Sequence, residues 1–181
     1  MHSFSFKIVL SVFLLTSFNL SAQKEKRKVF TTTPTYDEII ATYTDLLKGS
    51  KIGKLYETGP VDIGKPLHMV IISKDGNFDY KTWGAKTKIL INNGIHPGEP
   101  DGIDACIELV KNFVMHPELL PDNVGICIVP VYNIAGCLNR SATSRANQNG
   151  PEEYGFRGSA RNLDLNRDFV KCDAPNTLLL E

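Results

Sequence analysis

The sequence has 181 residues, of which 42% are hydrophobic and 22% are charged. This is enough apolar material for one ordinary globular core, and it excludes a disordered chain. Basic and acidic residues number 20 each, so the formal net charge is zero. A balanced charge gives no reason to expect nucleic acid or an anionic membrane surface as a partner.

The first residues have the layout of a secretory signal peptide. One lysine precedes an apolar run over residues 8–18, and small residues follow before a charged stretch. The apolar run is too short to span a bilayer comfortably. We therefore predict a signal peptide over 1–22, a polar linker over 23–33, and a mature protein that is secreted or periplasmic. The alternative is a buried N-terminal helix, which the charged run "KEKRK" disfavours.

Residues 35–49 predict an amphipathic surface helix. Apolar side chains recur at helical spacing, Thr35 and Glu38 form a capping-box pattern, and Gly49 is a stop signal. The following stretch, 54–73, is interpreted as a β-hairpin around a Gly-Lys-Pro turn.

Next come the three segments expected to form the centre of the fold. "KTKILINN" is an apolar strand, residues from Pro100 onward have helical spacing up to His116, and "VGICIVPVYN" is a strand covered on both faces. The order strand, helix, strand indicates a right-handed crossover and an α/β sheet with a parallel pair of strands. Ligand sites in such sheets lie beyond the carboxyl ends of the strands.

The first of these carboxyl ends carries His96-Pro97-Gly98-Glu99. A histidine and a glutamate two residues apart can both reach one divalent ion, and imidazole plus carboxylate suits zinc. The alternative is that Glu99 only favours the N-terminus of the next helix and His96 is an exposed turn residue. The local sequence leaves both interpretations open.

The second carboxyl end opens a long segment, 133–169, with little periodicity and five arginines at positions 140, 145, 157, 161 and 167. Segments of this length inside a compact domain are unusual unless they are functional. A fixed guanidinium can stabilise an oxyanion, and an arginine beside an asparagine can bind a carboxylate. The alternative is a solvated or anion-binding loop.

Three motifs in this order, "HPGE", "VPVYNIAG" and "RNLDLNRDF", together resemble the zinc carboxypeptidase (metallocarboxypeptidase) family, in particular its bacterial exported peptidase-like branch. The resemblance covers about Thr33 to the C-terminus. It implies a three-layer α/β/α fold with a mixed, partly parallel sheet. It also implies that Zn²⁺ is the cofactor and that a peptide or related amide is hydrolysed by a zinc-activated water.

The resemblance also implies roles for individual residues. His96 and Glu99 match two zinc ligands, and Asn166 with Arg167 matches the pair that binds the substrate carboxylate. Asn133 and Gly136 match the ends of the family's Asn-Pro-Asp-Gly turn, although Ile134 and Ala135 replace its middle. The arginine that stabilises the oxyanion is expected between this turn and the Asn-Arg pair. Arg145 is our choice there, with Arg140 as the reserve; Asp164 stands just ahead of the Asn-Arg pair.

Two features depart from the family pattern. Gly98 stands where digestive carboxypeptidases have a substrate-binding arginine, which leaves the substrate side chain and strict C-terminal cleavage open. The third ligand, a histidine, and the general-base glutamate come after the Asn-Arg pair in the family, whereas the last histidine here is His116. His116 follows the far end of the predicted helix, about 20 Å away, and His68 has no ligand spacing.

We therefore expect residues 34–181 to be the N-terminal part of a zinc carboxypeptidase-like catalytic domain that is inactive by itself. Two alternatives remain open at this point. One is a deacylase-like zinc amidohydrolase, and the other is a noncatalytic peptide-binding module.

Overall fold

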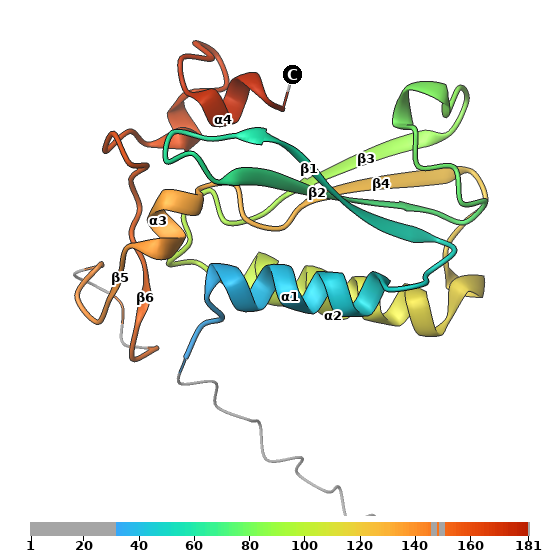
Figure 1. Cartoon of the computed structure of the whole chain (residues 1–181), viewed down its shortest axis with the longest axis horizontal. Helices are drawn as coiled ribbons and strands as arrows, with labels where there is room; N and C mark the ends of the chain where they lie inside the picture. The colour runs from blue at the N-terminus through green and yellow to red at the C-terminus, as the bar shows by residue number, and fades with distance from the viewer. Residues whose placement is uncertain (1–31, 146–147, 149–150, 181) are drawn as a thin grey trace, which may run out of the picture.

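The computed structural model describes residues 32–145, 148 and 151–180. Its centre is a four-stranded mixed sheet in the order β1-β2-β4-β3 (Figure 1). The strands are β1 (Gly53–Pro60), β2 (Pro66–Ser73), β3 (Thr87–Asn92) and β4 (Val124–Val129). Strand β2 pairs antiparallel with both β1 and β4, and β4 pairs with β3 in parallel. The predicted signal peptide and most of the linker lie outside the described residues.

The two long helices, α1 (Tyr36–Leu47) and α2 (Asp101–Met115), lie on the same face of the sheet (Figure 1). The capping box predicted for α1 is present: the Thr35 side chain accepts from the backbone N–H of Glu38, whose carboxylate accepts from the Thr35 N–H. The apolar side of α1 is buried against the sheet and α2. Because local caps and apolar spacing agree, this helix forms where the sequence predicts it.

The β3-α2-β4 unit confirms the predicted α/β class with a partly parallel sheet. Strand β4 is shorter than the apolar run that predicts it. It ends at Val129, and the chain then turns so that Asn133 caps the next helix, α3 (Ile134–Leu138). The carboxyl ends of β3 and β4 therefore lie side by side, as they must in a parallel pair.

The segment after β4 gathers at these carboxyl ends (Figure 1). It contains α3, the two-stranded ribbon β5 (Arg140–Ser141) and β6 (Tyr154–Gly155), the 3₁₀ turn η3 (Leu165–Arg167), and α4 (Pro175–Leu178). Two further 3₁₀ turns, η1 (Tyr80–Thr82) and η2 (Pro117–Leu119), lie elsewhere. Among the residues that the structure describes, no helix is both long and apolar enough to cross a membrane.

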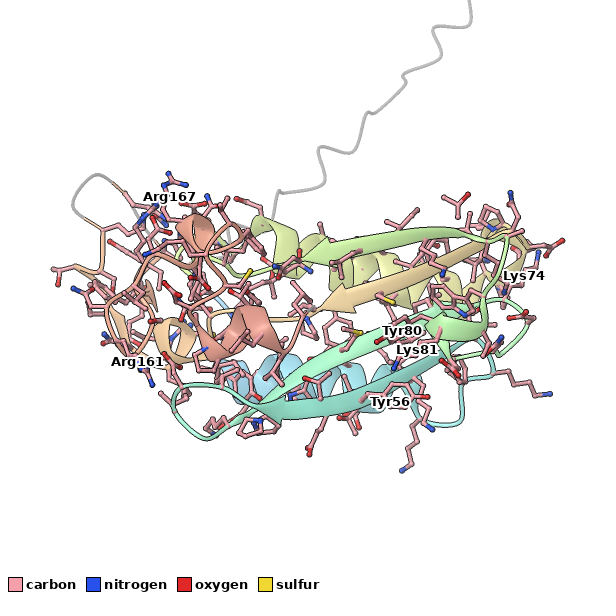
Figure 2. The ribbon with its side chains drawn as sticks, turned by 90° about the horizontal axis from the view of Figure 1, so that it is seen from above. Tyr56, Lys74, Tyr80, Lys81, Arg161 and Arg167 are labelled. Carbon is pink, nitrogen blue, oxygen red and sulfur yellow. The ribbon has the colours of Figure 1, made fainter. Side chains whose placement is uncertain are left out.

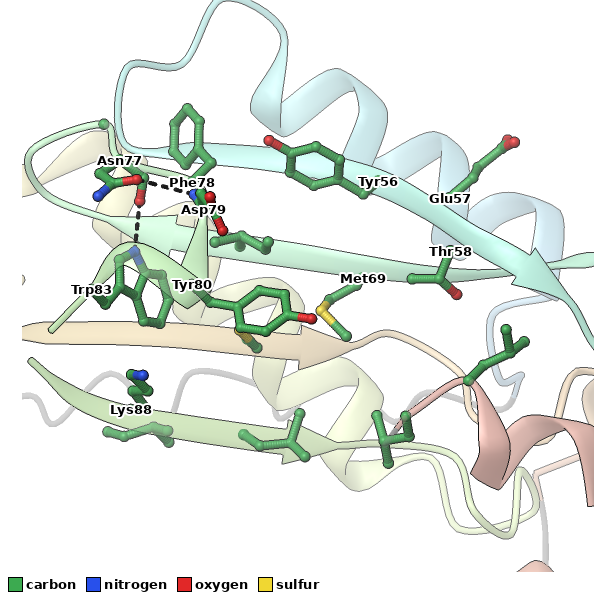
Figure 3. Close-up of a pocket in the computed structure, with 17 residues that line it drawn as sticks. Tyr56, Glu57, Thr58, Met69, Asn77, Phe78, Asp79, Tyr80, Trp83 and Lys88 are labelled. Carbon is green, nitrogen blue, oxygen red and sulfur yellow. Dashed lines mark hydrogen bonds between the residues drawn. The ribbon is translucent and has the colours of Figure 1, made fainter. Parts of the chain in front are cut away.

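The sheet face opposite α1 and α2 carries an apolar groove of about 850 Å³ (Figure 3). Aromatic rings from β1 and from the connection before β3 line it, together with aliphatic side chains of β3. Leu90 is 52% exposed on β3, which is an edge strand of the described sheet. Trp83 closes one end, where its indole N–H donates to the carbonyl oxygen of Asn77 at 2.8 Å.

Candidate metal and substrate site

The His96 to Glu99 turn follows β3, which ends at Asn92, after a short connection over residues 93–95. The backbone N–H of Glu99 donates to the carbonyl oxygen of His96 at 2.9 Å, which closes a tight turn. Gly94 has a positive φ of 62°, a conformation that glycine adopts without strain. This backbone brings Nδ1 of His96 to 3.7 Å from Oε1 of Glu99. The two side chains that the sequence singled out therefore converge.

Asp164 holds the other nitrogen of the imidazole ring. Its Oδ1 lies 2.9 Å from Nε2 of His96, across 68 residues of sequence. The hydrogen bond to His96, together with those from Arg157 and the Asn166 backbone N–H, lowers the pKa of Asp164 to about 2, although burial opposes this. Asp164 is therefore ionised, and Nε2 of His96 can donate its proton to this carboxylate.

This arrangement fits a divalent metal ion. A histidine whose second nitrogen contacts a carboxylate is oriented for coordination, and Nδ1 of His96 faces both the Glu99 carboxylate and the Arg157 guanidinium. Nitrogen and carboxylate oxygen are donors that zinc accepts. His96 is buried, whereas the Glu99 side chain is 51% exposed. The pair can thus hold an ion at the surface of a partly enclosed site.

Arg145, our choice for the oxyanion arginine, lies at this turn. Its guanidinium contacts the Glu99 carboxylate through Nη1 and Oε1. Burial alone would raise the pKa of Glu99, but the hydrogen bond and charge of Arg145, with the nearby charges of His96 and Arg157, lower it overall. Glu99 is thus ionised at neutral pH.

Arg157 also belongs to the site, although the sequence did not single it out. Its Nε and Nη2 lie 3.2 and 2.9 Å from Oδ2 of Asp164, and its Nη1 lies 3.3 Å from Nδ1 of His96. The Asn133 side-chain amide donates to the carbonyl oxygens of Arg157 and Gly158, at 3.0 and 3.1 Å. The asparagine of the "NIAG" motif thus fixes the backbone that carries this arginine.

Gly136, at the other end of that motif, allows the same backbone to approach. A Cβ atom there would lie 2.4 Å from the carbonyl oxygen of Phe156. The spacing of Asn133 and Gly136 predicts a turn that binds another part of the backbone. It does not predict that this part is the backbone of Arg157 and Gly158.

Arg140, the reserve choice, does not lie at the site. Its guanidinium donates to the backbone carbonyl oxygens of Thr33, Pro34 and Glu153, at 2.8, 3.1 and 3.1 Å. It therefore fastens the segment before α1 to the β5-β6 ribbon.

Asn166 and Arg167 lie in η3, two and three residues after Asp164. Asn166 lines a cavity of about 240 Å³ together with His96 and Glu99. Arg167 is exposed at the same end of the molecule (Figure 2), and its Nη1 donates to the carbonyl oxygen of Asn166 at 3.0 Å. The structure thus brings Asn166 beside His96 and Glu99, while the Arg167 side chain does not line that cavity.

The other described histidines lie outside this site. His116 caps the far end of α2 and pairs with Glu118 at 3.4 Å. His68 is buried on β2, where its ring nitrogens face Tyr36 at 3.0 Å and Glu57 at 3.5 Å. Within 32–145, 148 and 151–180, no cluster of three or more His, Cys, Asp or Glu side chains has metal-binding geometry. The described residues thus bring together two candidate ligands, His96 and Glu99.

Comparison with known proteins identifies the class. The sequence model of the zinc carboxypeptidase family matches residues 34–176, so the chain belongs to this family. This confirms the resemblance carried by the three motifs. A comparison with curated protein sequences finds no match.

Solved carboxypeptidases share the fold. A putative carboxypeptidase from Burkholderia mallei is 21% identical with a TM-score of 0.62, covering 82% of this chain and 35% of that one. Carboxypeptidase A from Helicoverpa armigera is 17% identical with a TM-score of 0.63, covering 83% and 42%. A metallo-carboxypeptidase from Pseudomonas aeruginosa, in complex with (2-guanidinoethylmercapto)succinic acid, is 15% identical with a TM-score of 0.58, covering 82% and 36%. This chain thus spans less than half the length of these structures.

Proposed function

We propose that the chain contributes to a zinc-dependent metallopeptidase of carboxypeptidase type, which hydrolyses a peptide or related amide. One observation carries the proposal. Asp164 binds Nε2 of His96 and leaves Nδ1 facing Glu99 at 3.7 Å. This is the arrangement expected of a coordinating histidine and a neighbouring carboxylate ligand.

The residues divide into three roles under this proposal. His96 and Glu99 hold the metal, and Asp164, itself held by Arg157, keeps the imidazole in one tautomer and orientation. When bound, zinc acts as a Lewis acid and lowers the pKa of a coordinated water. Asn166 and Arg167 orient the carboxylate end of the substrate, and Arg145 stabilises the negative charge that develops on the carbonyl oxygen.

Arg145 suits the oxyanion role better than Arg157. Arg157 contacts Asp164 through two nitrogens, so its guanidinium is fixed beside the imidazole. Arg145 contacts one oxygen of Glu99, an exposed side chain. Its guanidinium can turn from Glu99 towards a substrate with the loss of one contact.

We further propose that the 181-residue chain by itself hydrolyses no peptide, because the residues that the structure describes supply two protein ligands, one fewer than a catalytic zinc site has. The leader-like N-terminus supports export to the periplasm or the medium. Gly98 carries no side chain into the site, so substrate selection depends on other residues.

Zinc binding to the purified chain tests the proposal. We expect Zn²⁺ to bind in competition with a chromophoric chelator, and His96→Ala and Glu99→Gln each to abolish most of that binding. His116→Ala is the matched control and should bind as the wild type does. Equal zinc affinity in wild type and His96→Ala would refute the metal site, and zinc-dependent peptide cleavage by this chain alone would refute its inactivity. Turnover of acylated amino acids but not peptides by the whole protein would favour a deacylase.

A further inference from the structure

Both donor atoms that we assign to the metal are already contacted by guanidinium groups. Arg145 contacts Oε1 of Glu99, and Nη1 of Arg157 lies 3.3 Å from Nδ1 of His96. Each donor that a metal ion would use thus receives a hydrogen bond from a positive group.

The charges in this cluster balance without a metal. Arg145 and Arg157 carry two positive charges, and Glu99 and Asp164 carry two negative ones. The pairs are joined through His96, which contacts both acids. Opposite charges in contact at such a partly enclosed site stabilise each other.

The backbone holds Arg145 over the metal-binding turn. A Cβ atom on Gly98 would lie 2.9 Å from Cδ of Arg145, so the missing side chain at position 98 makes room for the arginine stem. The buried Tyr154 hydroxyl donates to the Arg145 carbonyl oxygen at 3.0 Å. The Gln148 amide donates to the Gly98 carbonyl oxygen at 3.0 Å. Tyr154 thus holds the Arg145 backbone, and Gln148, three residues later, binds the turn itself.

We propose that Arg145 is a displaceable counter-ion that occupies the Glu99 carboxylate in the metal-free protein and, with the fixed Arg157 beside His96, sets the affinity of the site for a divalent cation. The inference rests on the proposed metal site. Like charges a few ångströms apart repel, so Arg145 leaves Glu99 when a cation binds there. Its guanidinium is then free to face the substrate, which couples metal loading to the oxyanion role.

Arg145 gives the cleaner test because Arg157 also positions Asp164. We would measure Zn²⁺ affinity of the 181-residue chain by chelator competition for the wild type, Arg145→Leu and Arg145→Lys. Leucine keeps an apolar stem over Gly98 without a charge or a metal donor, and lysine keeps the charge. Arg161→Leu is the matched control, because Arg161 is an exposed arginine at the same end of the molecule (Figure 2).

We expect Arg145→Leu to bind Zn²⁺ about tenfold more tightly than the wild type, which corresponds to removing one modest competing interaction. The Zn²⁺ affinities of Arg145→Lys and Arg161→Leu should stay within about twofold of the wild type, a change of about 0.4 kcal/mol at most. The first variant keeps the positive charge, and the second changes an arginine outside the cluster. Unchanged or weaker zinc binding in folded Arg145→Leu, while His96→Ala loses binding, would overturn this inference and leave the proposed metal site intact. If His96→Ala also kept the zinc affinity of the wild type, the proposed metal site itself would be overturned.

A second measurement uses the wild-type chain and does not depend on the folding of the leucine variant. The Nε–H resonance of Arg145, assigned with Arg145→Lys, should shift on titration with Zn²⁺ and reach its limit when the site is full. An Arg145 resonance that stays in place at saturating Zn²⁺ would show that the arginine is not displaced.

Discussion

Oδ1 of Asp164 lies 2.9 Å from Nε2 of His96, although 68 residues separate them in the sequence. This contact joins the turn after β3 to the turn before η3. It decides which imidazole nitrogen is left for a metal. Spacing that was weak evidence for a metal site is thus joined by a contact that orients His96 towards Glu99.

Replacing Asp164 by asparagine tests that contact. Asp164→Asn keeps the size of the side chain but loses the charge that accepts the Nε2 proton, so we expect zinc affinity to fall about 10- to 100-fold. Chelator competition measures the change. Asp45→Asn, on the exposed side of α1, is the control and should bind as the wild type does. If Asp164→Asn retained full affinity, the carboxylate would not be orienting the ligand.

Asp168 should stabilise the fold in a pH-dependent way. Its carboxylate accepts from the Thr177 hydroxyl at 2.6 Å and from the backbone N–H groups of Ala174 and Asp173 at 2.9 and 3.0 Å. The Thr177 hydrogen bond and these N–H groups lower the pKa of Asp168, although burial opposes them. We expect Asp168→Asn to lower the free energy of unfolding by about 1–3 kcal/mol at pH 7.

The sign of the pH effect follows from the lowered pKa. The ionised form is favoured in the folded chain, so this stabilisation is complete above the ordinary aspartate pKa of about 3.9 and is lost as pH falls through the folded value. Urea unfolding at pH 7, 5 and 3 should show the difference between wild type and Asp168→Asn shrinking at the lowest pH. Asp122→Asn, at an exposed ion pair with Lys74, should cost at most about 1 kcal/mol. A difference independent of pH would exclude an ionised Asp168.

Gly98→Ala should disturb the metal-binding turn by crowding. The added Cβ would lie 2.7 Å from the backbone carbonyl oxygen of Gly155 and 2.9 Å from Cδ of Arg145. Because backbone cannot move as a side-chain tip can, we expect a loss of about 1–3 kcal/mol in urea unfolding. Gly59→Ala is the matched control, since its Cβ would meet only the flexible side chain of Leu179. A larger loss in the control than at Gly98 would contradict this packing.

The groove on the sheet face opposite α1 and α2 should bind apolar dyes. It is lined by aromatic and aliphatic side chains, including Leu90, which is 52% exposed (Figure 3). Anilinonaphthalene sulfonate should therefore fluoresce with the native chain, and Leu90→Ser should reduce that signal. Leu119→Ser, an equally exposed leucine at 54% in η2, is the control. An equal loss in both variants would argue against dye binding in the groove.

The elements of the fold followed from local patterns. Thr35 and Glu38 cap α1 as predicted, and β3, α2 and β4 appear in the predicted order with a parallel pair. These features depend on side-chain periodicity and on hydrogen bonds between near neighbours, which a single sequence contains. The α/β class with a partly parallel sheet is therefore confirmed.

The site was only partly predictable. His96 and Glu99 converge as their spacing indicated, and Asn166 lines the same cavity. Arg157 was not singled out because its position depends on the Asn133 amide binding carbonyl oxygens 24 and 25 residues later. Local sequence does not encode such a contact, since many loop paths share the same composition. Arg140 illustrates the reverse case, an arginine in the same segment that binds the backbone near Thr33.

The state of the His96 ring in the presence of zinc tests the central claim most directly. Long-range proton–nitrogen NMR of the ¹⁵N-histidine-labelled chain, with His96 assigned through His96→Gln, reports each ring nitrogen separately. We expect Zn²⁺ to shift Nδ1 of His96 while Nε2 keeps its proton and its hydrogen bond to Asp164. A His96 ring that is unchanged by saturating Zn²⁺, or one that binds zinc through Nε2, would contradict the account.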